Sequence, residues 1–277
     1  MLSAEDKEIL GKIHRVSLYI LLAFDKVCRD HDLTYFLDSG TALGAVRHGG
    51  FIPWDDDVDV GMPRKDYERF LQIGQSCLPE DIFLQTRETD KAYKRYAAKL
   101  RLKGTILQEY DDLPYEQNGL FIDIFPFDNI PQYKCIARIN VGVVRLLHYL
   151  VRVRWISTPK FNTKFRNMIG LLIKRIPESF IIRIEKLMMN LCRKYENQDT
   201  GYMTCFFWIM TLHNTYIFKT SKIFPVKNIL FEGALVKIMN DPDYYLKILY
   251  GEYMKLPPEE MRNCHHIKGT VDFGKYA

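Results

Sequence analysis

The sequence has no paired cysteines, no long apolar run and no signal-type N-terminus. Its six cysteines are scattered without a C-x-x-C pair, which argues against a zinc site or a disulfide framework. Free thiols of this kind are typical of a reducing compartment. Because no uncharged apolar run reaches about 18 residues, we expect no membrane-spanning helix. We also expect no signal peptide, and hence a cytoplasmic location, with the inner face of the membrane as the alternative.

The composition is ordinary for a globular protein, but the charge is unevenly distributed. The 277 residues are 47% hydrophobic and 26% charged, enough for one large domain or two small ones. Residues 131–199 contain 14 Lys or Arg and 4 Asp or Glu, whereas the whole chain has a net charge of +5. This excess predicts an anionic partner for the segment, either a membrane or a polymer. A basic helix face that meets only water is the alternative.

Residues 57–60, Asp-Val-Asp-Val, alternate acidic and β-branched side chains, which predicts a half-buried strand. Asp57 and Asp59 would then share one face, with Cβ atoms roughly 6–7 Å apart. Two carboxylates this close repel each other unless one is protonated or a cation lies between them. The pattern therefore predicts a site for Mg²⁺, with Mn²⁺ as the alternative ion, held by carboxylates together with substrate phosphates.

A glycine turn precedes the acidic residues by about 17 positions. The segment 35–37 predicts a short strand, and Ser39, Gly40 and Thr41 lead from it into a predicted helix over 41–46. The N–H groups at such a helix start can bind an anion. Arg47 follows in the loop and could hold a phosphate through two N–H groups, although a salt bridge to a nearby acid is the alternative.

Two other interpretations of the acidic segment are less specific. The run of aspartates could be a solvated loop without a ligand. It could also be a calcium loop, because Asp55, Asp57 and Asp59 occupy positions 1, 3 and 5 of an EF-hand. That interpretation fails at Val60, where the motif needs Gly, and at Asp66, where it needs Glu.

The run over residues 38–62 closely resembles the signature of the LicD family. Near the end of the chain, the segments 231–233 (F-E-G), 250–254 (Y-G-E-Y-M) and 257–258 (P-P) resemble the closing elements of that family. The family contains bacterial phosphocholine transferases and is related to the fukutin-like proteins. Two departures are mild: Ala42 stands where Leu is common, and Asp38 precedes the Ser-Gly turn.

The resemblance implies an α+β fold with a nucleotidyltransferase-like mixed β-sheet core flanked by helices, and a largely helical additional lobe. Residues 1–130 would form the catalytic core and residues 131–220 the basic helical lobe. Residues 221–277 would pack back on the core and complete the substrate site. The apolar spacing over residues 3–32 predicts a long amphipathic helix that covers the sheet, with Ser3 as its N-cap.

The resemblance also implies a third carboxylate on a strand beside the first two. Asp123 fits this role, since it is one acid within the apolar run 119–128 and would be costly to bury unless paired or bound to a metal. We expect Asp57, Asp59 and Asp123 to be the catalytic residues and metal ligands, with Asp123 helping to deprotonate the acceptor hydroxyl. The predicted substrate-binding residues are Ser39, Gly40, Thr41, Arg47, Lys99, Arg101 and His266.

The implied reaction moves phosphocholine, or a similar phospho-alcohol, from a CDP-activated donor to a hydroxyl of a cell-surface glycan precursor. The acceptor would be a lipopolysaccharide, teichoic acid or capsule precursor, and CMP would leave. Ethanolamine, ribitol and glycerol phosphates remain open as the transferred group. The alternatives are a nucleotidyltransferase that uses a nucleoside triphosphate and a non-catalytic nucleotide-binding module. No nucleic-acid partner is expected.

Overall fold

The computed structural model describes residues 3–108, 117–155, 164–208, 216–262, 264 and 271–276. It confirms the expected α+β class, with helices packed against a mixed sheet. The chain divides into two compact units. Residues 1–126 and 218–277 form unit 1, and residues 127–217 form unit 2.

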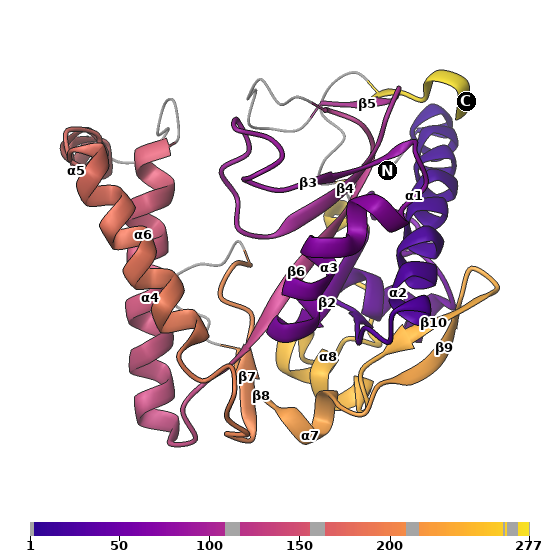
Figure 1. Cartoon of the computed structure of the whole chain (residues 1–277). Helices are drawn as coiled ribbons and strands as arrows, with labels where there is room; N and C mark the ends of the chain where they lie inside the picture. Colours follow the sequence, from indigo (N-terminus) through magenta and orange to yellow (C-terminus); the bar gives the residue numbers. More distant parts are fainter. Residues whose placement is uncertain are drawn as a thin grey trace. The chain divides into compact units, whose positions relative to one another are not determined.

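The expected N-terminal helix is present as α1 (Ala4–Asp30) in unit 1. Ser3 caps it and forms a reciprocal capping box with Asp6, which satisfies two backbone N–H groups at the helix start. One face is apolar and buried, including Ile13, Ile20 and Phe24. This face packs the helix along one side of the sheet (Figure 1).

The central sheet of unit 1 has the strand order β1-β2-β6-β4-β3. β4 runs antiparallel to both of its neighbours, β6 and β3. The apolar run that contains Asp123 is therefore a central strand, as its sequence predicts. The strands are β1 (Phe36–Leu37), β2 (Asp59–Pro63), β6 (Phe121–Asn129), β4 (Ala98–Leu102) and β3 (Ile82–Gln85).

One prediction about the sheet is wrong in its boundary. The strand expected over residues 57–60 begins only at Asp59, and Asp57 lies in the preceding loop. The reason lies in β1, which is two residues long and gives way to helix α2 (Ser39–His48) directly after Asp38. The last bond on that side joins the Asp38 N–H to the Asp59 carbonyl, so residues before Asp59 have no β1 partner.

Further helices and strands complete unit 1 around this sheet. Helix α3 follows β2, and the C-terminal part adds a β-hairpin, β9–β10, that the sequence reading did not anticipate. A short pair, β5–β11, joins the tail to the core. These elements are α3 (Arg64–Cys77), β5 (Ile106–Leu107), β8 (Phe218–Lys219), α7 (Thr220–Ile223), β9 (Lys227–Phe231), β10 (Ala234–Ile238), α8 (Pro242–Tyr250), η1 (Glu259–Met261), β11 (Val271–Asp272) and η2 (Gly274–Tyr276).

Unit 2 is largely helical, as expected for this part of the chain. It contains α4 (Lys134–Trp155), α5 (Lys164–Lys174) and α6 (Glu178–Arg193). One strand, β7 (Tyr202–Thr204), pairs with the end of β6. Within the described ranges, none of the helices is long and apolar enough to cross a membrane.

Substitution of two glycines, one in each unit, can test the packing around each position. At Gly119 an added Cβ would collide with the carbonyl oxygen of Leu102 and approach the Thr105 hydroxyl to 2.8 Å, whereas nothing lies within 4 Å at Gly142 in α4. We predict that Gly119→Ala lowers the free energy of unfolding by about 1–3 kcal/mol. Gly142→Ala, the matched control, should raise it by about 0.5–1 kcal/mol through helix propensity. Urea unfolding measures both; equal or greater stability of Gly119→Ala would contradict the packing described.

Candidate active site

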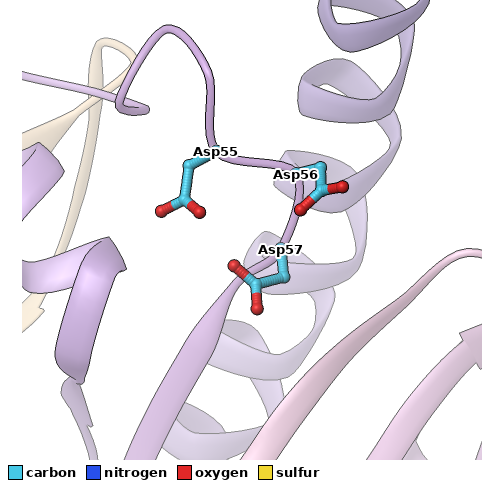
Figure 2. A group of neighbouring side chains, drawn as sticks. All are labelled: Asp55, Asp56 and Asp57. Atoms are coloured by element: carbon cyan, nitrogen blue, oxygen red, sulfur yellow. The ribbon is translucent and has the colours of Figure 1, made fainter. Parts of the chain in front are cut away.

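The acidic loop before β2 brings three carboxylates together. The ligand oxygens of Asp55, Asp56 and Asp57 lie within 4.8 Å of one another. Asp55 and Asp57 extend toward one side of the loop and Asp56 toward the other (Figure 2). Asp56 is buried. Asp55 and Asp57 therefore share the side on which a ligand could be held, and Asp55 is a candidate ligand that sequence reasoning did not select.

The other two predicted acids lie beside this loop. The Asp123 N–H donates to the Val58 carbonyl at 2.8 Å, which places β6 next to the residue between Asp57 and Asp59. Burial, followed by repulsion from Asp57 and Asp123, raises the pKa of Asp59 well above its usual value. The structure thus brings the three predicted acids together, although Asp57 reaches the site from a loop.

This donor set fits a divalent cation. Carboxylate oxygens are the ligands that Mg²⁺ and Mn²⁺ prefer. The raised pKa of Asp59 reflects negative charges held close together in a largely buried place, and a cation between them would remove that repulsion. The residues present therefore suit the implied metal, with Asp55 as a possible fourth contributor beside the predicted three.

The two basic residues predicted to contact substrate lie inside the fold. Lys99 is fully buried, its Nζ 3.0 Å from Asp123 Oδ2 and 3.2 Å from the centre of the Phe121 ring. Arg101 is also fully buried and donates to Gln85 Oε1 at 2.5 Å and to the Gly119 carbonyl at 2.9 Å. Lys99 is thus part of the acidic centre, whereas the contacts of Arg101 favour a structural role. A substrate contact by either residue stays a prediction.

The glycine turn is the start of helix α2. Asp38 caps this helix and accepts the Ser39 N–H at 2.6 Å. An added Cβ at Gly40 would lie 2.7 Å from Asp55 Oδ2, so a larger residue there would displace the Asp55 carboxylate from the helix start. In the part of the chain that the structure describes, the N–H groups of Gly40 and Thr41 have no hydrogen-bond partner. They remain suited to hold a phosphate oxygen.

His14, which sequence reasoning did not select, and Thr41, a predicted substrate-binding residue, both contact the acidic centre. The His14 Nε2–H of α1 donates to the Asp55 carbonyl at 2.7 Å, and its ring stacks on Phe51 at 4.1 Å. Thr41 Oγ1 accepts the Asp59 N–H at 2.8 Å. Since a carbonyl can only accept, the His14 proton lies on Nε2; burial lowers the pKa of this imidazole. No local pattern in the sequence signals these contacts.

Residues of the C-terminal segment contact the start of helix α2 and the segment just before the acidic loop. Glu232 Oε1 accepts the Phe51 N–H at 2.9 Å, and the Tyr245 hydroxyl donates to Asp38. The pKa of the Tyr250 hydroxyl is raised well above its usual value by burial of this group and by the charges of the surrounding aspartates, Asp38 first. The residue as a whole is 44% exposed. Only the resemblance of the tail to the family's closing elements pointed to this region.

A basic group lies next to the acidic one. The Trp54 ring has the Arg47 guanidinium 6.0 Å from its centre and the Arg262 guanidinium 5.3 Å from it. Arg47 donates to the Tyr253 carbonyl at 2.8 Å, and Arg262 to the Pro257 carbonyl at 2.9 Å. Burial lowers the pKa of Arg47, and the nearby Arg262 charge adds to this effect. Within the described chain neither guanidinium forms a salt bridge, which suits an anionic ligand.

The remaining predicted site residues are Ser39 and His266. Ser39 has a φ of +45°, an uncommon value for a residue with a Cβ and one found mostly at functional sites. His266 lies outside the described residues, and its role stays a prediction.

Comparison with known proteins finds similarity to one family. Residues 32–136 match the model of the LicD/FKTN/FKRP nucleotidyltransferase domain. This match covers a little over a third of the chain. This match contains the glycine turn, the acidic loop and Asp123, and it confirms the resemblance inferred from residues 38–62.

Two relatives extend the comparison. The chain is 28% identical to the lipopolysaccharide cholinephosphotransferase LicD of Haemophilus influenzae over 265 residues, which covers 91% of this chain and 94% of that protein. It is 56% identical over 97 residues to the human ribitol 5-phosphate transferase FKRP, which covers 34% of this chain and 16% of that protein. The first match therefore includes unit 2 and the C-terminal segment, whereas the second is confined to part of the chain.

The repulsion among the acids can be tested through stability. We predict that Asp59→Asn raises the free energy of unfolding by roughly 1 kcal/mol at neutral pH without divalent cations, because it removes a charge that its neighbours repel. The pKa of this carboxyl is higher in the folded state than in the unfolded state. Such a group destabilises the folded state at a pH above its folded-state pKa, and the effect is absent at a pH below its unfolded-state pKa. The gain should therefore vanish below about pH 3.8.

The control is Asp30→Asn, which removes an exposed partner of Lys26 and should lower stability slightly or not at all. Thermal melting in a chelating buffer across a pH series measures both variants. A loss of stability in Asp59→Asn at neutral pH would contradict the electrostatics described here.

Proposed function

We propose that the protein is a phosphotransferase that moves phosphocholine, or a similar phospho-alcohol, from a CDP-activated donor to a hydroxyl of a cell-surface glycan precursor. The precursor would belong to a lipopolysaccharide, teichoic acid or capsule, and CMP would be released. The observation that carries this proposal is the group Asp55, Asp57, Asp59 and Asp123 inside a LicD-family domain. The long match to a lipopolysaccharide cholinephosphotransferase favours choline as the transferred alcohol.

The chain's own residues have separate roles in this proposal. Asp57, Asp59 and Asp123, with Asp55, would hold Mg²⁺ or Mn²⁺, which supplies positive charge against the donor's diphosphate. The N–H groups of Gly40 and Thr41 would hold a non-bridging phosphate oxygen.

Asp123 would take the proton from the attacking hydroxyl. Lys99 Nζ donates to Asp123 Oδ2 at 3.0 Å, which would hold this carboxylate in position. Binding and orientation of the two substrates account for the rest of the expected catalysis.

The two arginines beside Trp54 indicate which part of the donor, its choline or its diphosphate, would lie beside this ring. A trimethylammonium group would be repelled by two guanidinium groups, so Trp54 does not suit a choline cage. A phosphate would instead be attracted by both charges. We therefore propose that Arg47 and Arg262 both bind the donor's diphosphate. Arg47 was already a predicted substrate-binding residue, and Arg262 is added by the structure.

The proposal can be tested with a panel of donors. We predict that CDP-choline with Mg²⁺ raises the melting temperature more than CDP-ethanolamine, CDP-ribitol, CDP-glycerol, CTP or ATP, since bound ligand stabilises the folded state. Asp57→Asn should retain the fold and lose turnover by at least about 100-fold. The substitution removes a carboxylate ligand of the metal ion, and that ion is expected to bind the donor's phosphates. CMP release with a glycan acceptor measures turnover.

Stabilisation by CTP or ATP alone, with release of pyrophosphate, would favour the nucleotidyltransferase alternative. Turnover by Asp57→Asn equal to that of the unaltered protein would remove the metal assignment. A largest shift with CDP-ribitol would keep the reaction class and change the transferred alcohol, in line with the FKRP match.

The arginine assignment makes a separate prediction. Arg262→Gln should raise the KM for the donor by roughly 10–100-fold, because a charge-assisted hydrogen bond contributes about 1.5–3 kcal/mol. We expect kcat to change less, since Arg262 binds a phosphate in the ground state as well as in the transition state. The control is Lys255→Gln, at an exposed basic residue of the same segment. An unchanged KM in Arg262→Gln would contradict the assignment.

A further inference from the structure

Helix α4 of unit 2 has an apolar stripe on its exposed side as well as one on its buried side. Ile136, Ile139, Val143 and Leu146 are between 41% and 66% exposed. Their spacing of three, four and three residues places them on one face of the helix. The buried face is made by other residues, including Val141. An apolar stripe that the unit does not cover requires another partner to remove it from water.

The two neighbouring helices have the same property. Both α5 and α6 pack against α4. On α5, Met168, Leu171 and Leu172 follow a one-face spacing and are each more than half exposed. On α6, Phe180 and Leu187 are two turns apart on one face and are 53% and 51% exposed. Such exposed apolar residues recur on all three helices of unit 2.

The charge of these helices is strongly positive. Their sequences contain 11 Lys or Arg and only 2 Asp or Glu, and both acids are on α6. Basic and apolar side chains are interleaved: exposed Arg138 precedes Ile139 on α4, and exposed Arg183 lies between Phe180 and Leu187 on their face of α6. Helices that combine an apolar face with many basic residues are typical of membrane-surface binding.

We infer that α4, α5 and α6 dock unit 2 on an anionic phospholipid surface, with the exposed apolar residues in the headgroup region and exposed basic residues such as Arg138 and Arg183 against lipid phosphates. The positive charge and the exposed apolar side chains together distinguish among the partners that could cover this surface. In a symmetric dimer through this surface, like positive charges would face each other. A soluble polyanion would satisfy the charges but leave the apolar stripes in water. A lipid surface satisfies both, and it needs no spanning helix.

This inference is independent of the proposed chemistry, because it concerns unit 2 and not the acidic centre. Basic residues near an anionic bilayer attract it over about a Debye length, and apolar insertion then holds the protein in place.

The test is flotation of the full chain with vesicles of phosphatidylcholine alone or mixed with phosphatidylglycerol. We expect binding to the mixed vesicles, weaker binding to phosphatidylcholine alone, and weaker binding at high salt. The variant Ile139→Glu/Leu146→Glu should bind the mixed vesicles at least about tenfold less tightly, because the transfer free energy of two apolar side chains is lost.

The matched control is Leu230→Glu/Leu235→Glu. These two residues face each other across the β9–β10 hairpin of unit 1 and are 58% and 57% exposed. The control should bind vesicles like the unaltered protein, and unchanged melting of both variants should show that the fold is kept.

Four outcomes would overturn the inference. The first is equal binding by Ile139→Glu/Leu146→Glu and the unaltered protein. The second is an equal loss of binding in the hairpin control. The third is a dimer, seen by light scattering, that the α4 variant converts to a monomer while vesicle binding is absent. Complete competition by soluble polyglutamate at moderate ionic strength would also count against a lipid surface with apolar insertion.

Discussion

Mutual repulsion of a few carboxylates is the constraint on which the rest of unit 1 depends. Asp55, Asp57 and Asp59 lie on one short loop and strand, and Asp123 joins them from β6. Charges held this close in a largely buried place destabilise the folded state unless other groups keep them in position. Those groups come from distant parts of the sequence: a histidine of α1, a lysine of β4, a threonine of α2 and a glutamate of the C-terminal segment.

The same constraint explains why the positive charges lie where they do. Lys99 is buried beside Asp123, where it offsets one of the acids. Arg47 and Arg262 lie around Trp54, next to the acidic loop, and neither forms a salt bridge within the described residues. A diphosphate can bind a cation and guanidinium donors at the same time, so this neighbourhood of charges suits the proposed donor. The positive charge of unit 2 is a different feature, because it accompanies exposed apolar side chains.

Local patterns in the sequence predicted the parts that depend on near neighbours. The apolar spacing over residues 3–32 predicted α1, and a single acid within an apolar run identified Asp123 as part of a buried strand. The run at residues 38–62 predicted the resemblance to the LicD family that the match over residues 32–136 confirms. The predicted strand at Asp57 failed because strand length depends on the pairing partner, and β1 ends after two residues. His14, Tyr250 and Arg262 were missed as members of the site because their contacts join residues far apart in the chain.

The sequence by itself determined the resemblance to the LicD family, the α+β class and three of the four acids, because these follow from residue types in local patterns. Tertiary structure decided which side chains meet those acids, which basic residues are buried and which helix faces stay exposed. Those properties depend on contacts between segments up to about 200 residues apart, such as Glu232 with Phe51. No local pattern encodes such a contact, since it exists only once the two segments have folded against each other.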